Sequence, residues 1–154
     1  MDRSIIDQYE EGIAKLRTAI ARMSEADLKK APIPGKWSTH QVIVHLADAE
    51  AAFADRVRRI LAEDEPTLMA WDENRFVQNL HYDAQSAVDA IEIIALTRRQ
   101  IVRLLRAVPA AALERTGNHS ERGRQTVKDV LGYAVPHLEH HLKFVAEKRK
   151  ALGL

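Results

Sequence analysis

GKWSTHQVIVHLADAE, residues 35–50, is the stretch of this chain that most directly predicts its fold. Ser38 is followed three residues later by Gln41, the spacing of a capping box in which each side chain bonds the backbone N–H of the other residue. Beyond this start, apolar residues recur at helical spacing from Val42 to Ile60. The stretch therefore predicts a long amphipathic helix that begins at Ser38.

Three other segments have the same helical periodicity. They run from about Ser4 to Met23, from about Asp83 to Ala107, and from Thr126 toward the end of the chain. Proline and glycine residues cluster between the segments, and no alternating pattern is long enough to indicate a strand. The chain is therefore expected to fold as an all-α four-helix bundle.

The connection between the second and third helices, Glu63 to Tyr82, is unusually long. Helices of a bundle are usually joined by roughly 2–8 residues. This connection contains the aromatic-rich piece LMAWDENRF, residues 68–76, which is expected to form a short helix or a cap over one end of the bundle. A long crossover also allows the helices to depart from simple up-down order.

Composition predicts one globular domain over residues 1–154, because 46% of the residues are hydrophobic and 29% are charged. The net charge of +1 argues against a nucleic-acid binder. The absence of cysteine excludes disulfides, a cysteine-ligated zinc site and a cysteine nucleophile. Because neither a signal-peptide pattern nor a membrane-spanning stretch is found, we expect a cytoplasmic protein without a membrane partner.

Histidines carry the chemical signal of the chain. His137 and His141 are four residues apart, so on a helix they share one face and can bind one metal ion from the same side. A third ligand, His45, would come from the helix that begins at Ser38 and would complete a three-histidine site. On a helical wheel, His137 and His141 border the apolar stripe, whereas His140 faces outward. Spacing alone also allows all of these histidines to be surface residues.

Two acidic residues are candidate catalytic groups that would orient a ligand or transfer a proton. Asp48 is three residues after His45, although a solvated helix face is the commoner role for such a residue. Glu50 lies within the apolar stripe, and a buried carboxylate must be paired or hydrogen-bonded. Its candidate partners are the arginines Arg56, Arg98 and Arg99.

Simpler roles are expected for several other histidine and aromatic residues. His40 is expected only to support the helix start, and no role is expected for His81 or His119. Trp37 is expected to pack against the bundle beside the helix cap. Trp71 is expected to line the mouth of a pocket or to cap the core, as is Phe76.

Three separated strings resemble the DinB/YfiT-like superfamily of metal-dependent enzymes. They are GKWSTHQVIVHLADAE at 35–50, DRVRRILAEDEPTLMAWDEN at 55–74 and HLEHHLKFV at 137–145. The resemblance implies a four-helix bundle with a long second connection, and often a homodimer. It also implies a divalent metal ion, zinc or nickel above all, bound by His45, His137 and His141.

The resemblance leaves the activity open among three functions. The first is an S-transferase that acts with a low-molecular-weight thiol such as bacillithiol, mycothiol or glutathione. The second is a hydrolase in which the metal activates water, and the third is a metal-binding stress or interaction bundle without turnover. Three neutral imidazoles leave the charge of the ion uncompensated, which lowers the pKa of water and of a thiol alike. Both enzymes would act on a small-molecule substrate.

Overall fold

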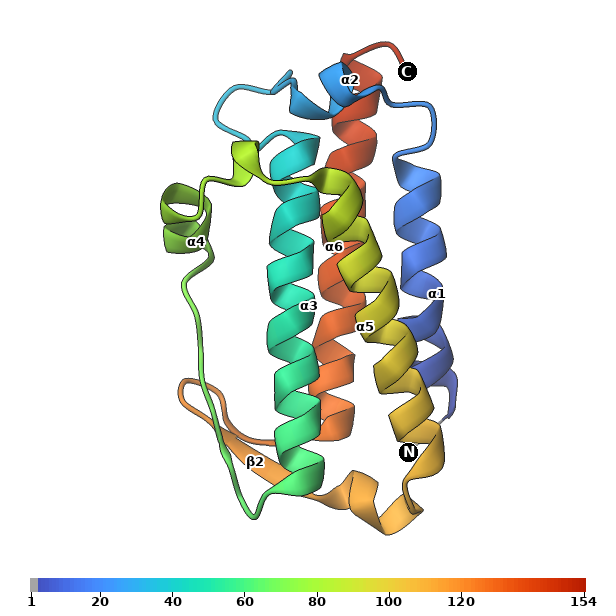
Figure 1. Cartoon of the computed structure of the whole chain (residues 1–154), viewed down its shortest axis with the longest axis vertical. Coiled ribbons are helices and arrows are strands. Elements are labelled where there is room, and N and C mark those ends of the chain that lie inside the picture. The colour runs from blue at the N-terminus through green and yellow to red at the C-terminus, as the bar shows by residue number, and fades with distance from the viewer. Residues whose placement is uncertain (1–2) are drawn as a thin grey trace.

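The computed structural model describes residues 3–154 and contains four long helices that lie side by side (Figure 1). These helices are α1 (Arg3–Ala19), α3 (Thr39–Ala62), α5 (Ala87–Ala107) and α6 (Val127–Ala151). α3 packs against α5 and α6, and α1 packs against the same two helices. The predicted four-helix bundle with a long second connection is thus confirmed.

The starts of α3 and α6 are each held by a capping box. Ser38 Oγ accepts from the backbone N–H of Gln41 at 3.1 Å, and Gln41 Oε1 accepts from the N–H of Ser38 at 3.0 Å. Thr126 and Asp129 form the same reciprocal pair at the start of α6. Because both helices begin at the predicted residues, the histidines that follow lie at defined turns of each helix.

The long connection contains two helical pieces and one short strand. Strand β1 (Thr67–Leu68) comes first, followed by helix α4 (Glu73–Asn79) and a 3₁₀ turn (Tyr82–Ala84). Asp72 caps α4 by accepting from two backbone N–H groups of its first turn. LMAWDENRF therefore includes the start of a short helix, one of its two predicted forms, and the connection runs alongside α3 (Figure 1).

The structure corrects two helix boundaries. The first long helix ends at Ala19 rather than Met23, and a separate short helix, α2 (Glu25–Lys29), follows it. The third long helix begins at Ala87 rather than Asp83. Ser86 is the reason, because its side chain accepts from the N–H of Asp89 and starts the helix there.

A small sheet at one end of the bundle was not predicted. Strand β2 (Thr116–His119) pairs in parallel with β1 and in antiparallel fashion with β3 (Gly123–Thr126). Strands of two to four residues are too short to produce a recognisable alternating pattern, which explains the error. The sheet joins the long connection to the segment that leads into α6.

α6 continues as one helix through Pro136, although a proline inside a helix removes one backbone hydrogen bond. Within residues 3–154, no helix has both the length and the apolar character needed to cross a bilayer.

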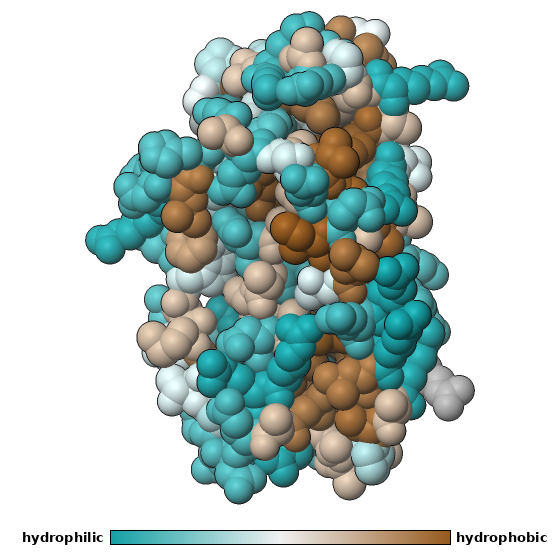
Figure 2. Space-filling model, viewed as in Figure 1, coloured by the Kyte–Doolittle hydropathy of each residue, from teal (hydrophilic) through white to brown (hydrophobic). Residues whose placement is uncertain are grey.

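Hydrophobic residues are exposed on the face of the molecule that carries α5 (Figure 2). Val88, Ile93 and Leu96 of α5 are the exposed apolar residues there. An apolar helix face of this kind is a candidate contact for the homodimer, which stays a prediction.

A buried polar network crosses the core between α1, α3 and α5. Arg98 Nε donates to Glu50 Oε2 at 2.8 Å, and Arg98 Nη1 donates to the backbone oxygen of Tyr9 at 2.8 Å. The hydroxyl of Tyr9 in turn donates to Glu50. Gly12 makes room for the guanidinium, because a Cβ atom at this position would lie 1.9 Å from Arg98 Nη1. The network therefore satisfies each polar group that it places in the core.

Candidate metal centre

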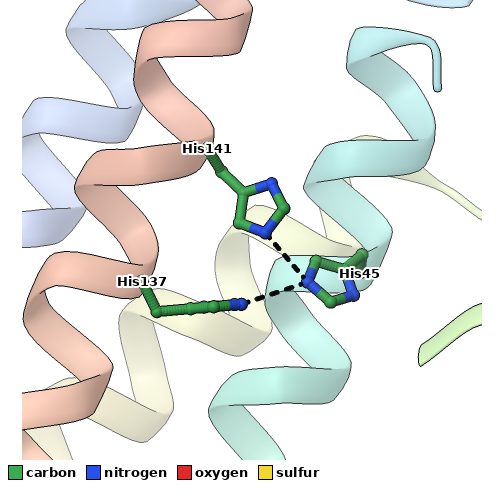
Figure 3. A group of neighbouring side chains, drawn as sticks. All are labelled: His45, His137 and His141. Atoms are coloured by element: carbon green, nitrogen blue, oxygen red, sulfur yellow. Dashed lines mark hydrogen bonds between the residues drawn. The ribbon is translucent and has the colours of Figure 1, made fainter. Parts of the chain in front are cut away.

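Three histidine side chains from α3 and α6 point toward one another (Figure 3). His45 Nε2 lies 3.1 Å from His141 Nε2 and 3.3 Å from His137 Nε2. One possible ligand atom from each of the three residues lies within 4.8 Å of the others. The structure therefore brings together the three residues that the sequence analysis selected as metal ligands.

The two helices place these side chains at different depths. His45 is fully buried on α3, whereas His137 and His141 are half-buried and lie about one turn apart on α6. His140, one residue before His141, is exposed, as the helical wheel predicted. The cluster thus has one side in the core and another side that solvent or a small molecule can reach.

Burial keeps the three imidazoles neutral at pH 7. It lowers the pKa of His45 to about 4, with a further lowering by His137. It lowers the pKa of His137 to about 4 and that of His141 to about 3, where neighbouring histidines again add to the effect. A histidine must be deprotonated to bind a metal ion, so all three side chains have the required protonation state.

The donor set fits a divalent cation. Nitrogen ligands at about 2.0–2.1 Å from a tetrahedral Zn²⁺ ion are about 3.3 Å apart, close to the two Nε2 distances. The Nε2–H group of His45 can donate to the Nε2 atom of His137 or to that of His141, but not to both. One pair of facing nitrogens is therefore left with opposed lone pairs. In addition, the Nδ1 atoms of His45 and His141 are buried and have no partner among the described residues. A cation shared by the three Nε2 atoms would relieve the opposed lone pairs, although it would not bind the two Nδ1 atoms.

Glu73, at the start of α4, is the acidic side chain that the structure places beside the cluster. Its Oε2 atom lies 3.8 Å from His45 Nε2, and its side chain is 52% exposed. The sequence analysis missed Glu73, although it lies in the LMAWDENRF piece that drew attention through its aromatic residues. A carboxylate at this distance can accept a proton from a group held near the histidines.

Aromatic rings enclose His45 on two sides. The Trp37 ring lies 5.1 Å from the His45 ring between centroids, and the Trp71 ring stacks on it at 5.6 Å. Trp71 also makes an edge contact with Phe76 at 4.6 Å. These contacts hold the imidazole in a mainly apolar setting, which is a cause of its low pKa.

Two cavities flank the three histidines. A cavity of about 240 Å³ is lined by His137 and Trp71, and another of about 260 Å³ is lined by His141 and Trp37. Glu73 lines both. The first cavity, here named the His137 cavity, also contains His119, which is 5% exposed. The sequence analysis gave His119 no role, because its strand is too short to be recognised.

The two acidic residues predicted as catalytic groups have other partners. Asp48 accepts a hydrogen bond from the hydroxyl of Tyr82, and Glu50 belongs to the core network with Arg98, one of its three candidate partners. Within the described part of the chain, neither carboxylate is hydrogen-bonded to the clustered histidines. The structure therefore offers no contact through which Asp48 or Glu50 would orient a ligand.

Comparisons with known proteins agree with this fold. A family model of the DinB superfamily matches residues 8–145. A protein of Oceanobacillus iheyensis named "Putative metal-dependent hydrolase" is 27% identical over 147 residues, which are 94% of this chain and 85% of the relative. The Bacillus subtilis protein of the same name, YfiT, is 25% identical over 149 residues, which are 96% of this chain and 84% of YfiT.

A solved structure of YfiT from Bacillus subtilis, described as having an unusual four-helix bundle topology, superposes with a TM-score of 0.88. The match covers 98% of this chain and 87% of that one, at 24% sequence identity. This likeness establishes the fold. Together with the family match over most of its length, it shows that the chain belongs to the DinB superfamily and has the YfiT-like fold.

Proposed function

We propose that this protein is a hydrolase that depends on a divalent metal ion held by His45, His137 and His141. The observation that carries the proposal is the convergence of three neutral imidazoles between two cavities. The names of the relatives support the same class of reaction. When bound, the ion would act as a Lewis acid and lower the pKa of a coordinated water molecule to about 7.

The side chains around the histidines have complementary roles in this proposal. Glu73 accepts the proton of the attacking water, because its carboxylate lies beside His45 and is open to solvent. Trp37 and Trp71 exclude water from the side of His45 that they cover. The two cavities hold the parts of the substrate on either side of the bond that is cleaved.

Metal analysis tests the ligand set. The untagged protein, reconstituted with zinc or nickel, should contain about one ion per chain, the stoichiometry of a three-histidine site. His45→Ala should lose this ion, whereas His140→Ala, which changes an exposed neighbouring histidine, should retain it. A wild-type protein that binds neither metal would overturn the proposal.

Activity assays then separate hydrolysis from thiol transfer. The zinc-loaded protein should hydrolyse p-nitrophenyl acetate, and His45→Ala should not. The thiol S-transferase implied by the sequence resemblance is tested with glutathione and 1-chloro-2,4-dinitrobenzene in parallel. Thiol transfer without hydrolysis would contradict the hydrolase while keeping the same metal site.

A further inference from the structure

The His137 cavity is lined by two buried polar side chains, each with one nitrogen atom that has no hydrogen-bond partner among residues 3–154. Arg56 comes from α3 and His119 from β2, and each is only 5% exposed. Both line the cavity, together with Arg122 from the loop between β2 and β3. Buried polar groups in folded proteins are nearly always hydrogen-bonded, so two such atoms on residues of one cavity make this cavity a candidate binding site.

Arg56 is a buried cation that forms no ion pair with a carboxylate among residues 3–154. Its Nη2 atom donates to the backbone oxygen of Met69 at 2.8 Å, but its Nε atom has no partner among the described residues. Burial lowers the pKa of Arg56, and the nearby charge of Arg122 lowers it further. An arginine is rarely buried unless it is paired, so the positive charge of Arg56 remains available to an anion.

His119, which lines the same cavity, has an unpaired hydrogen-bond donor. The backbone N–H of Glu121 donates to His119 Nδ1 at 3.2 Å, so Nδ1 is the acceptor and the proton of the neutral ring is on Nε2. That Nε2 atom is buried and has no partner within residues 3–154. Burial lowers the pKa of His119, as do Arg56 and Arg122. The ring is therefore a neutral donor at pH 7.

Arg122 adds a second positive charge at the more exposed side of the cavity. Its guanidinium carbon lies 3.9 Å from the centre of the Tyr133 ring, which holds the group in place by a cation–π contact. Two carboxylates, Glu73 and Glu121, also line the cavity. Neither forms an ion pair with Arg56 or Arg122 in the part of the chain that the structure describes. Neither guanidinium group is therefore paired directly with a carboxylate among the described residues, although the charges of Asp55 and Glu121 are close enough to Arg56 to raise its pKa against the lowering by burial.

We propose that the His137 cavity binds an oxyanion, a carboxylate or a phosphate group, through Arg56, His119 and Arg122. The planar guanidinium fork matches the oxygens of both anions, and His119 supplies a further N–H donor. The proposal deepens the proposed function, on which its assignment to a substrate rests. The substrate would then be a small anionic molecule whose anionic group binds beside His137 and whose scissile bond lies near the three histidines.

Direct anion binding tests this inference without relying on activity. Inorganic phosphate is titrated into the zinc-loaded and the metal-free protein, with ³¹P NMR line broadening as the readout, and acetate is tested by calorimetry and as a competitor. Arg56→Gln should weaken binding about 10- to 100-fold, the equivalent of one hydrogen bond to a charged group. Arg122→Gln should weaken it several-fold. Arg103→Gln is the matched control, because it removes an exposed charge from α5, which does not line the cavity.

The outcomes separate the possible explanations. Arginine-sensitive binding that persists without metal supports the cavity site, and the tighter of the two probes identifies the anion. Binding that needs zinc and is unchanged in Arg56→Gln and Arg122→Gln would place the anion at the metal ion and overturn the inference, as would no binding of either probe. If Arg56→Gln does not fold, anion binding by Arg122→Gln, a change at an exposed residue, still tests the inference. Loss of metal binding alone would overturn the hydrolase but leave arginine-dependent anion binding intact.

Discussion

Glu50 on α3 and Arg98 on α5 form a buried ion pair in which Arg98 Nε donates to Glu50 Oε2 over 2.8 Å. Burial raises the pKa of Glu50, while the charge of Arg98 acts against that rise. The pair also reaches α1, because Arg98 and Glu50 both bond to Tyr9. A carboxylate that was a candidate catalytic group is thus a structural element of the bundle.

Replacing Glu50 should destabilise the fold without removing the metal ligands. Glu50→Ala leaves Arg98 buried and unpaired, which should lower the free energy of unfolding by about 3–5 kcal/mol. Urea titration followed by circular dichroism measures this change. Arg99→Ala, which truncates an exposed arginine on the same helix as Arg98, should stay within about 0.5 kcal/mol of wild type. A loss below about 1 kcal/mol in Glu50→Ala would contradict the structural role.

Alanine substitutions at two helical glycines should have opposite effects on the stability of the protein. A Cβ at Gly12 would lie 1.9 Å from Arg98 Nη1 and 2.7 Å from Leu138 Cδ2, so Gly12→Ala should cost about 1–3 kcal/mol of stability. A Cβ at Gly132 meets nothing within 4 Å. Gly132→Ala should therefore stabilise the protein by about 0.5–1 kcal/mol through its higher helix propensity. Thermal unfolding of the two variants checks both signs, and equal effects would show that the Arg98 contact is unimportant.

Glu73 should affect turnover more than metal binding. Glu73→Gln keeps the size of the side chain but removes its ability to accept a proton, so kcat for ester hydrolysis should fall about 10²–10⁴-fold. Metal content should remain at the wild-type level, because the three histidines are unchanged. Glu92→Gln, an exposed change on α5, serves as the control. An unchanged kcat in Glu73→Gln would exclude Glu73 as the proton acceptor.

Zinc affinity should be insensitive to pH down to about pH 5. Protons compete with a metal by binding the histidines, and competition begins only near the pKa of each ligand. The pKa values of about 4 for His45, about 4 for His137 and about 3 for His141 lie below the ordinary value of 6.5. The apparent affinity should thus stay nearly constant from pH 7.5 to about 5 and fall steeply at lower pH. Titration with a chromophoric zinc chelator at several pH values measures it, and a steep decrease already near pH 6.5 would contradict the low pKa values.

Local signals predicted the helices well because their starts involve neighbouring residues. The Ser38–Gln41 and Thr126–Asp129 pairs are three residues apart, so both capping boxes can be recognised without a structure. The sheet was missed because its pairing joins residues such as Leu68 and His119, which are distant in sequence. The single domain, the cytoplasmic location, the homodimer and the choice of zinc or nickel stay predictions.

The candidate site was predictable in part. His137 and His141 share a helix face, so their spacing reveals them, and His45 on a second helix was the candidate third ligand, in agreement with the family resemblance. Glu73 lies on a short helix and His119 on a short strand, and the positions of both elements depend on tertiary packing. Asp48 was selected for its closeness to His45 in sequence, yet its side chain bonds to Tyr82.

Part of the wall of the His137 cavity comes from segments other than the two helices that carry the three histidines. The histidines stand on α3 and α6, whereas Trp71, Glu73, His119 and Arg122 come from the long connection and the β2–β3 hairpin. Loops tolerate changes in length and composition better than packed helices do. Selectivity for a new molecule could therefore be engineered by redesigning these two surface segments while the bundle, and the ion-binding residues within it, are kept intact.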